Sequence, residues 1–280
     1  MYFSRTTFGE GDVDFREVKF DAGNISFIRV RFGEGDVDFS KAVFGKGSID
    51  FSLSHILGHA DFSMLSGASA ITSLSFRHCT FDHSLDLSGN HFSCIPDLTN
   101  TKLTHQVSLD DVECKSRLNE EGKPDPEDGD RLCRLKEIAE SNKNHEQALD
   151  FHIDEMRVKR HKLSGINRII DKSFDAVSEY GRSVIKPLSW LIRSWYVFGL
   201  IYSCISIGLN PMKPWWEHFG NGFLYAAAQT TLFLPMARVL SSESMKDVPI
   251  WVLGVSLTQG LISFLLIFLI GLALRNRFRI

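Results

Sequence analysis

The sequence is poor in the features that mark an enzyme or a disulfide-stabilised secreted protein. Its five cysteines are odd in number and form no C-x-x-C pair, so we expect neither a disulfide framework nor a zinc site. This pattern agrees with a soluble part kept in a reducing cytosol. The net charge of −3 argues neither for nor against nucleic acid as a partner. No catalytic or metal-ligating arrangement stands out in the 280 residues, and we expect a protein that is not an enzyme and uses no metal or cofactor.

A repeat with a period of 12 residues fills the first part of the chain. The octapeptide FGEGDVDF occurs unchanged at 8–15 and 32–39, and each unit follows the pattern F-x4-F-x4-[VI]-x-F. Intervals of five and two residues cannot form a stripe on a helix, but they suit short strands joined by tight corners. We therefore expect a β-solenoid over residues 1–112 with the apolar residues stacked inside. We expect the glycines of the repeat to turn the chain: Gly9, Gly11, Gly33, Gly35, Gly45 and Gly47.

The pieces VDFRE, VDFSK, IDFSL and ADFSM resemble the pentapeptide-repeat proteins, whose β-helix is built from units of the form A-[DN]-[LF]-x-x. The resemblance covers about residues 1–110 and implies a β-solenoid while saying little about function. The 12-residue spacing departs from an unbroken run of five-residue units. The square cross-section that is usual for such a coil is therefore in doubt. Because the repeat begins at Phe3, we also expect another subunit to cover the apolar end of the first coil.

A connector follows the solenoid. Residues 113–130 are predicted to be an acidic linker, since the stretch 119–130 holds six acidic residues, two prolines and two glycines. Apolar residues at helical spacing then predict a helical hairpin over 131–163. Residues 166–186 keep a helical period with basic residues opposite the apolar face, which indicates an amphipathic helix on the inner face of a membrane.

The last third of the chain is predicted to be a membrane module over residues 188–280. The segments 188–209 and 249–274 each exceed the roughly 20 residues that a helix needs to cross a bilayer. The apolar segment 222–235 between them is too short, which favours a re-entrant helix. A helix lying along the outer interface is the alternative.

Basic residues at both ends of the membrane module predict its orientation. Arg182 and Lys186 precede the first span, and Arg275, Arg277 and Arg279 follow the second. Since basic flanks stay on the cytoplasmic side, both termini are expected in the cytoplasm. No signal peptide precedes the first repeat, so the first span is expected to target and anchor the chain.

Span, re-entrant helix and span together are typical of a pore subunit, and such pores close only when several copies surround an axis. We therefore expect a homo-oligomer in the lipid bilayer, a tetramer being one option. The pore-lining candidates are polar residues of the second span and of the end of the middle segment: Ser256, Gln259, Ser263, Gln229, Thr230 and Thr231. Small and polar residues also join helices in membranes, so these residues are expected either to line a pore or to pack helices together.

The densest basic run of the soluble part, together with a basic residue after it, forms a second set of candidates: Arg157, Lys159, Arg160, Lys162 and Arg168. Near a bilayer these side chains would attract anionic lipid. Around an oligomer axis they would form a positive ring able to hold an anionic oligonucleotide.

Three further segments resemble a class of bacterial membrane proteins with pentapeptide-type repeats and a two-span channel-like module: HEQALDFHIDEMRVKR at 145–160, YGRSVIKPLSW at 180–190 and ALRNRFR at 273–279. The nearest resemblance is to the transmembrane effectors of Hailong anti-phage systems. It implies an ion-channel-like effector that acts by abortive infection and is gated by its solenoid and connector. It also implies that a short single-stranded DNA, made by a partner nucleotidyltransferase, holds the channel closed. The alternative is a membrane-anchored scaffold whose solenoid docks a protein and whose spans form no pore.

Overall fold

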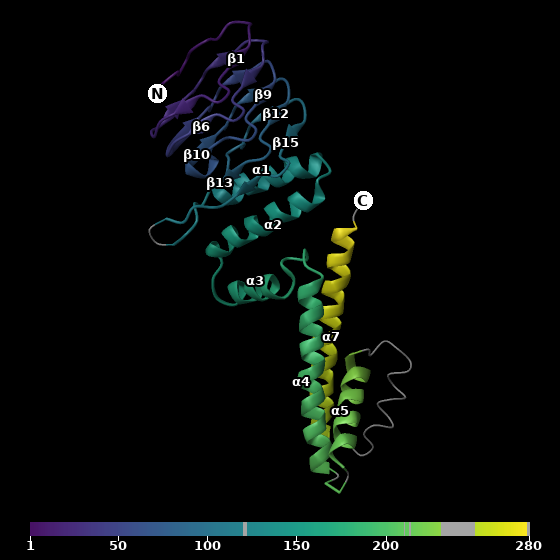
Figure 1. Cartoon of the computed structure of the whole chain (residues 1–280). Coiled ribbons are helices and arrows are strands. Elements are labelled where there is room, and N and C mark those ends of the chain that lie inside the picture. The colour runs from purple at the N-terminus through teal and green to yellow at the C-terminus, as the bar shows by residue number, and fades with distance from the viewer. Residues whose placement is uncertain (120–121, 210, 213, 231–249, 279–280) are drawn as a thin grey trace. The chain divides into compact units, whose positions relative to one another are not determined.

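The computed structural model describes residues 1–119, 122–209, 211–212, 214–230 and 250–278. The chain forms two compact units, Met1–Ser164 and Gly165–Ile280 (Figure 1). The first unit contains short parallel strands followed by two helices, and the second contains helices.

The strands of the first unit are two to five residues long, and a short 3-10 helix, η1 (Ala68–Ala70), interrupts them. They are β1 (Val13–Asp14), β2 (Lys19–Phe20), β3 (Ile25–Ser26), β4 (Arg31–Phe32), β5 (Val37–Asp38), β6 (Val43–Phe44), β7 (Gly47–Asp50), β8 (His55–Ile56), β9 (Ala60–Asp61), β10 (Ile71–Ser75), β11 (Thr80–Phe81), β12 (Leu85–Asp86), β13 (His91–Phe92), β14 (Lys102–Leu103), β15 (Val107–Ser108) and β16 (Glu113–Cys114).

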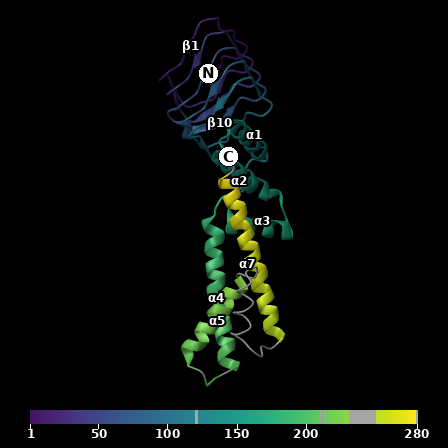
Figure 2. The same ribbon diagram turned by 90° about the vertical axis from the view of Figure 1, so that its right-hand side faces the viewer.

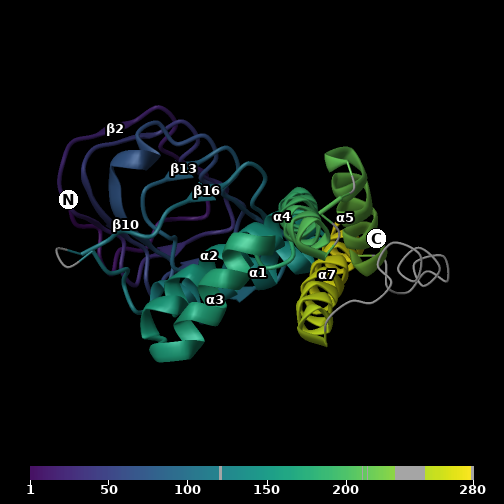
Figure 3. The same cartoon turned by 90° about the horizontal axis from the view of Figure 1, so that it is seen from below.

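One turn of the solenoid contains two of the 12-residue units. Parallel pairing places Val13 beside Val37, so a strand stacks on the strand 24 residues later. Four strands, β1 to β4, complete this turn before β5 returns beside β1, and the longest column of strands runs β1-β5-β9-β12-β15. The predicted β-solenoid is confirmed, with about four turns (Figure 3). Four strands make up each of the first two turns, β1–β4 and β5–β8, and three strands make up each of the next two, β9–β11 and β12–β14.

The aspartate of the repeat stabilises a corner in which one residue has a left-handed backbone conformation. In the unit VDFSK, Asp38 Oδ1 accepts a hydrogen bond from Ser40 N (2.8 Å), and Ala42 N donates to Phe39 O (2.9 Å) across a turn with Lys41 at φ 57°. Such positive φ values recur along the solenoid at residues other than glycine: Arg5, Glu17, Arg29, Lys41, Leu53, Met64, His78, Asn100 and Asp111. Four of these nine corners, at Glu17, Lys41, Leu53 and Met64, follow an Asp-Phe pair whose aspartate accepts the same backbone hydrogen bond, whereas the residue at the left-handed position varies.

The prediction that glycines turn the chain is wrong for these corners. None of the six glycines named above has a φ in the left-handed region. A Cβ atom added to Gly33 would lie 2.2 Å from Gly9 O, and one added to Gly35 would lie 2.3 Å from Gly11 C. Gly33, Gly35, Gly45 and Gly47 are required because the backbones of successive coils approach too closely there for any side chain, whereas Gly9 and Gly11 have nothing within 4 Å of an added Cβ.

Phenylalanine rings stacked along the solenoid form its core. The rings of Phe27 and Phe51 lie 4.6 Å apart, and those of Phe39 and Phe62 lie 4.8 Å apart, each pair nearly parallel. Neighbouring columns meet edge to face, as Phe39 and Phe51 do at 5.6 Å. Each such pair stabilises the fold by about 0.5–1.5 kcal/mol beyond the burial of its area.

A helical hairpin closes the C-terminal end of this core. It consists of α1 (Asp128–Ser141), α2 (His145–Lys159) and the 3-10 turn η2 (Arg160–Lys162). Leu132, Leu135 and Phe151 belong to the same buried cluster as the phenylalanine columns. Side-chain amides of Asn142 and Gln147 donate to carbonyl groups of the last coil, so its exposed backbone acceptors are satisfied.

The boundaries of the predicted linker are corrected in two places. Strand β16 carries the solenoid pairing to Cys114, inside the predicted linker of 113–130. Helix α1 begins at Asp128 instead of after Asp130, because Asp128 and Asp130 occupy its first turn, where carboxylates favour the helix dipole. Residues 120–121 of the linker lie outside the described residues.

The second unit contains α3 (Gly165–Ser178), α4 (Ile185–Leu209), α5 (Trp215–Thr230) and α7 (Ile250–Arg277) (Figure 2). Helices α4 and α7 are long and apolar enough to cross a membrane, with mean hydropathies of 1.3 and 2.3. The predicted two spans are thus present as helices of suitable length and composition.

Two helix boundaries in this unit also differ from the prediction. The amphipathic helix ends at Ser178 instead of 186, because Glu179, Tyr180 and Gly181 all have positive φ. The middle helix begins at Trp215 instead of 222, directly after Pro214, a residue favoured at helix starts. Residues 231–235 of the predicted re-entrant segment and Pro249 of the second span lie outside the described residues.

Candidate functional site

Helices α4 and α5 pack closely because each of them has a glycine at its contact with the other. A Cβ on Gly222 would lie 2.3 Å from Ser203 Oγ, and a Cβ on Gly199 would lie 2.6 Å from the ring of Phe223. Small residues that allow such approach are the usual means by which helices associate in membranes. The short helix α5 is therefore held firmly against the first long one.

Helices α4 and α7 run antiparallel, so their basic ends coincide. Asn276 Nδ2, near the end of α7, donates to Gly181 O just before α4 (3.2 Å). The same loop is held to α3 by a hydrogen bond from Tyr180 OH to Asp171 Oδ2 (2.8 Å). Lys186 lies at this end, together with the last turn of α7 and its two arginines. The basic residues that flank the two long helices therefore lie at the same end of the helix pair.

Hydroxyl groups from all three helices meet between α4, α5 and α7. Tyr225 OH lies 3.1 Å from Ser256 Oγ, and Tyr202 OH donates to the same oxygen at 3.5 Å. The two tyrosine rings lie 4.7 Å apart, edge to face. A further buried pair, Ser206 Oγ and His218 Nδ1, is 2.9 Å apart between α4 and α5.

Gln259 extends this cluster along α7. It is fully buried, and its Nε2 donates to Ala226 O (2.8 Å) and to Thr230 Oγ1 (3.1 Å). One turn further along, Ser263 is buried as well. We call these eight residues the polar seam: Ser206, His218, Tyr202, Tyr225, Ser256, Gln259, Thr230 and Ser263.

Three of the pore-lining candidates therefore lie buried inside the helix packing of a single chain: Ser256, Gln259 and Ser263. Ser256, Gln259 and Ser263 share one face of α7, as predicted, and that face turns toward α4 and α5. Thr230 and Gln229 are half-buried on α5, whereas Thr231 lies outside the described residues. This placement favours the packing alternative for the hydrogen-bonded groups.

Sequence reasoning identified Thr230 but missed the other four seam residues of α4 and α5: Tyr202, Ser206, His218 and Tyr225. Tyr202 and Ser206 lie four residues apart on α4, as do Gly199 and Ser203, and all four are buried. This polar and small-residue spacing in an apolar span is the signal that could have identified the seam. The contribution of His218 had no comparable signal.

Three buried polar atoms have no hydrogen-bond partner among the described residues of this unit: Ser194 Oγ, Gln259 Oε1 and Ser263 Oγ. In hydrocarbon an unpaired amide or hydroxyl group costs several kcal/mol, since no lipid atom replaces the bond. Other buried side chains of the seam are paired. These three atoms are the chemically unsatisfied part of the module.

The basic candidates fall into two groups with different surroundings. Lys159 Nζ donates to the buried carboxylate of Glu155, which also accepts from Lys136 Nζ (2.7 Å). Burial alone would raise the pKa of Glu155, but these two lysines outweigh it and hold that pKa below its ordinary value. Lys159 is thus tied to the hairpin's own structure.

The other basic candidates point to solvent. Arg157 is exposed and pairs with Asp154 at 3.6 Å, and Lys162 is exposed with a long contact of 3.4 Å to Pro126 O. Arg160 is half-buried, and Arg168 is exposed on α3 in the second unit. The structure places the four residues from Arg157 to Lys162 together at the end of the hairpin.

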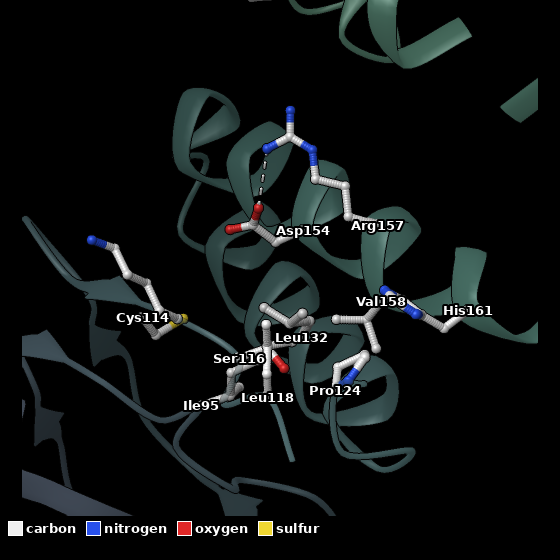
Figure 4. A pocket seen from close by; sticks show the side chains of 11 residues that line it. Ile95, Cys114, Ser116, Leu118, Pro124, Leu132, Asp154, Arg157, Val158 and His161 are labelled. Atoms are coloured by element: carbon white, nitrogen blue, oxygen red, sulfur yellow. Dashed lines mark ion pairs between the residues drawn. The ribbon is translucent and has the colours of Figure 1, made fainter. Parts of the chain in front are cut away.

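A cavity of about 210 Å³ opens beside this basic group, between the last coil, the linker and α2 (Figure 4). Apolar side chains such as Ile95, Leu132 and Val158 form its floor. Arg157 and His161 line its rim. An apolar floor beside the Arg157 guanidinium can accept a small apolar moiety that carries negative charge.

Comparison of the chain with protein-family models, with curated proteins and with solved structures finds no match.

Proposed function

We propose that the protein is an ion-channel-like effector of the bacterial inner membrane that acts as a homo-oligomer, with its solenoid and both termini in the cytoplasm. The observation that carries the proposal is α5. Its 16 described residues rise about 24 Å, less than the hydrocarbon core of about 30 Å, and its buried face packs between two span-length helices. A short helix joined to its neighbours by polar contacts suits a conducting module better than a simple anchor.

The amphipathic helix α3 supports the orientation. Ile166, Ile169 and Ile170 are 60 to 72% exposed on one face, and the loop after α3 is bonded to the basic end of α7. An exposed apolar face at the basic end fits the interfacial layer of the inner leaflet, where lipid would cover it. Both observations support the proposal that the chain enters the membrane module from the cytoplasmic side.

The role in anti-phage defence and its control rest on the resemblance of 145–160, 180–190 and 273–279. In this proposal a short single-stranded DNA binds the closed state more tightly than the open one and so keeps the pore shut. The exposed residues Arg157 and Lys162, together with the half-buried Arg160, would hold its phosphates.

Conductance tests the channel itself. The purified full chain, reconstituted in planar bilayers, should give single-channel currents, and its expression without a regulator should depolarise cells. A chain that assembles in the bilayer and never conducts would instead support the membrane-anchored scaffold.

Oligonucleotide binding tests the regulator. The double variant Arg157→Ala, Lys162→Ala should weaken binding of a short single-stranded DNA and reduce the slope of affinity against salt concentration. Lys46→Ala, which removes an exposed charge from the solenoid, is the matched control. Lys159 is left intact because its loss would leave Glu155 short of a partner. If the double variant and the control bind the DNA equally tightly, the binding site does not lie at the end of the hairpin.

A further inference from the structure

The polar seam extends over much of the depth of the membrane module. Ser206 lies about one helical turn from Tyr202 on α4, and Ser263 lies about 10 Å along α7 from Ser256. Because Tyr202 and Ser256 touch and the helices are antiparallel, Ser194 on α4 lies at about the level of Ser263. From Ser206 to this level the polar groups cover roughly 18 Å of a core about 30 Å thick.

The three unpaired atoms all lie on the side of Tyr202 and Ser256 that leads toward the basic end. Gln259 presents Oε1 there while its Nε2 is fixed by Ala226 and Thr230. Buried polar groups in native proteins are bonded to protein or to ordered water. Lipid chains can supply neither a donor to Gln259 Oε1 nor an acceptor to Ser263 Oγ, so water is the partner that these atoms require.

We propose that the polar seam is a water-containing path for protons inside each single chain. The inference rests on the proposed channel function and identifies the conducted species and its route. Tyrosine and serine hydroxyls, imidazole and water each accept a proton at one lone pair while releasing one from the opposite side. Within the described residues the side-chain hydrogen bonds of the seam form three separate groups, Ser206–His218, Tyr202–Tyr225–Ser256 and Gln259–Thr230, and water between them completes the path in this proposal. A proton that enters at His218 then leaves at the far end of the path, and every group returns to its original protonation state.

The chemistry of the seam favours protons over larger ions. Its eight side chains include no Asp, Glu, Lys or Arg, so no fixed charge compensates the lost hydration of a metal cation or of chloride. The contacts of 2.9 to 3.5 Å between facing groups leave no lumen at those points. Protons need only a chain of hydrogen bonds, whereas other ions need space.

Cysteine accessibility tests whether water enters. The variant Ser263→Cys is compared with Leu265→Cys at nearly the same depth, where the native leucine is 51% exposed toward lipid. Both are made in the full chain with Cys133→Ser and Cys204→Ser. The three remaining native thiols are buried, and burial raises the pKa of Cys94 to about 11, that of Cys79 to about 12 and that of Cys114 well above its ordinary value. A thiol ionises in water and not in lipid. In membrane vesicles a small cationic methanethiosulfonate should modify Cys at 263 at least tenfold faster than Cys at 265, and equal rates would overturn the proposal.

Proton flux into liposomes tests the route. Gln259→Leu should lower flux through the purified chain at least tenfold, whereas Thr258→Leu, one residue away on the lipid-facing side, should leave it unchanged. Equal flux in the Gln259 variant would overturn the route, and passage of sodium or choline as fast as protons would overturn the selectivity while the channel function stands. A chain that passes no ion would remove the channel function, and the accessibility result would still decide whether the seam holds water.

Discussion

Two glycines that occupy the same place in identical octapeptides should respond oppositely to substitution by alanine. Gly11 and Gly35 are both the fourth residue of FGEGDVDF. A Cβ on Gly35 would lie 2.3 Å from Gly11 C, 2.5 Å from Gly11 O and 2.6 Å from Asp12 N, all backbone atoms of the neighbouring coil. A Cβ on Gly11 would meet nothing within 4 Å.

The expected energies follow from these contacts. Gly35→Ala forces two coils apart at a point where Asp36 N donates to Asp12 Oδ1 (3.0 Å), and overpacking of this kind costs about 1–3 kcal/mol. Gly11→Ala restricts the unfolded chain without a clash and should stabilise by about 0.4–1 kcal/mol. For a unit of this size the net loss of about 2 kcal/mol in Gly35→Ala corresponds to a melting temperature lower by about 4–8 °C.

Thermal unfolding of the full chain in detergent, followed by circular dichroism at 218 nm, measures both variants. All five tryptophans lie between Trp190 and Trp251, so the tryptophan fluorescence transition of the second unit is an internal reference that should not move. The reasoning from coil stacking is refuted if Gly35→Ala and Gly11→Ala have the same circular dichroism melting temperature. It is also refuted if Gly35→Ala lowers the tryptophan fluorescence transition as much as the circular dichroism transition.

Three further variants probe other parts of the structure. Leu53→Gly should raise the circular dichroism melting temperature by up to a few degrees, since Leu53 is held at φ 64° at a cost of about 1 kcal/mol; a lower value would contradict that strain. Gly222→Ala should destabilise the α4–α5 contact by about 1–3 kcal/mol in tryptophan-monitored unfolding, whereas Gly220→Ala, which meets nothing within 4 Å, should not. Glu155 has a lowered pKa in the folded state, so the stability from its two lysine partners is present above its ordinary pKa of 4.5 and lost as the pH falls below it. Glu155→Gln should flatten that part of the stability profile between pH 7 and pH 3, and an unchanged slope would exclude the carboxylate as its source.

The candidate site was only partly visible in the sequence. The spacing of Ser256, Gln259 and Ser263 placed them on one face of a helix, since a helical period fixes which residues share a face. It did not indicate what that face meets, because hydropathy gives the length of a span and not its rotation about its axis. Tyr202 and Tyr225 complete the seam only because α4 and α5 cross at Gly199 and Gly222.

By itself the sequence determined the architecture of each unit. The repeated phenylalanines excluded a helix and predicted a solenoid, and two apolar runs predicted two span-length helices, because burial of apolar side chains at a fixed period leaves a direct trace in the residue order. Only the tertiary structure decided that two repeats make one turn, that glycines serve coil stacking, and that the hairpin closes the core. These features depend on which backbone lies against which, and contacts between residues 24 or more apart follow from the folded geometry instead of from local pattern.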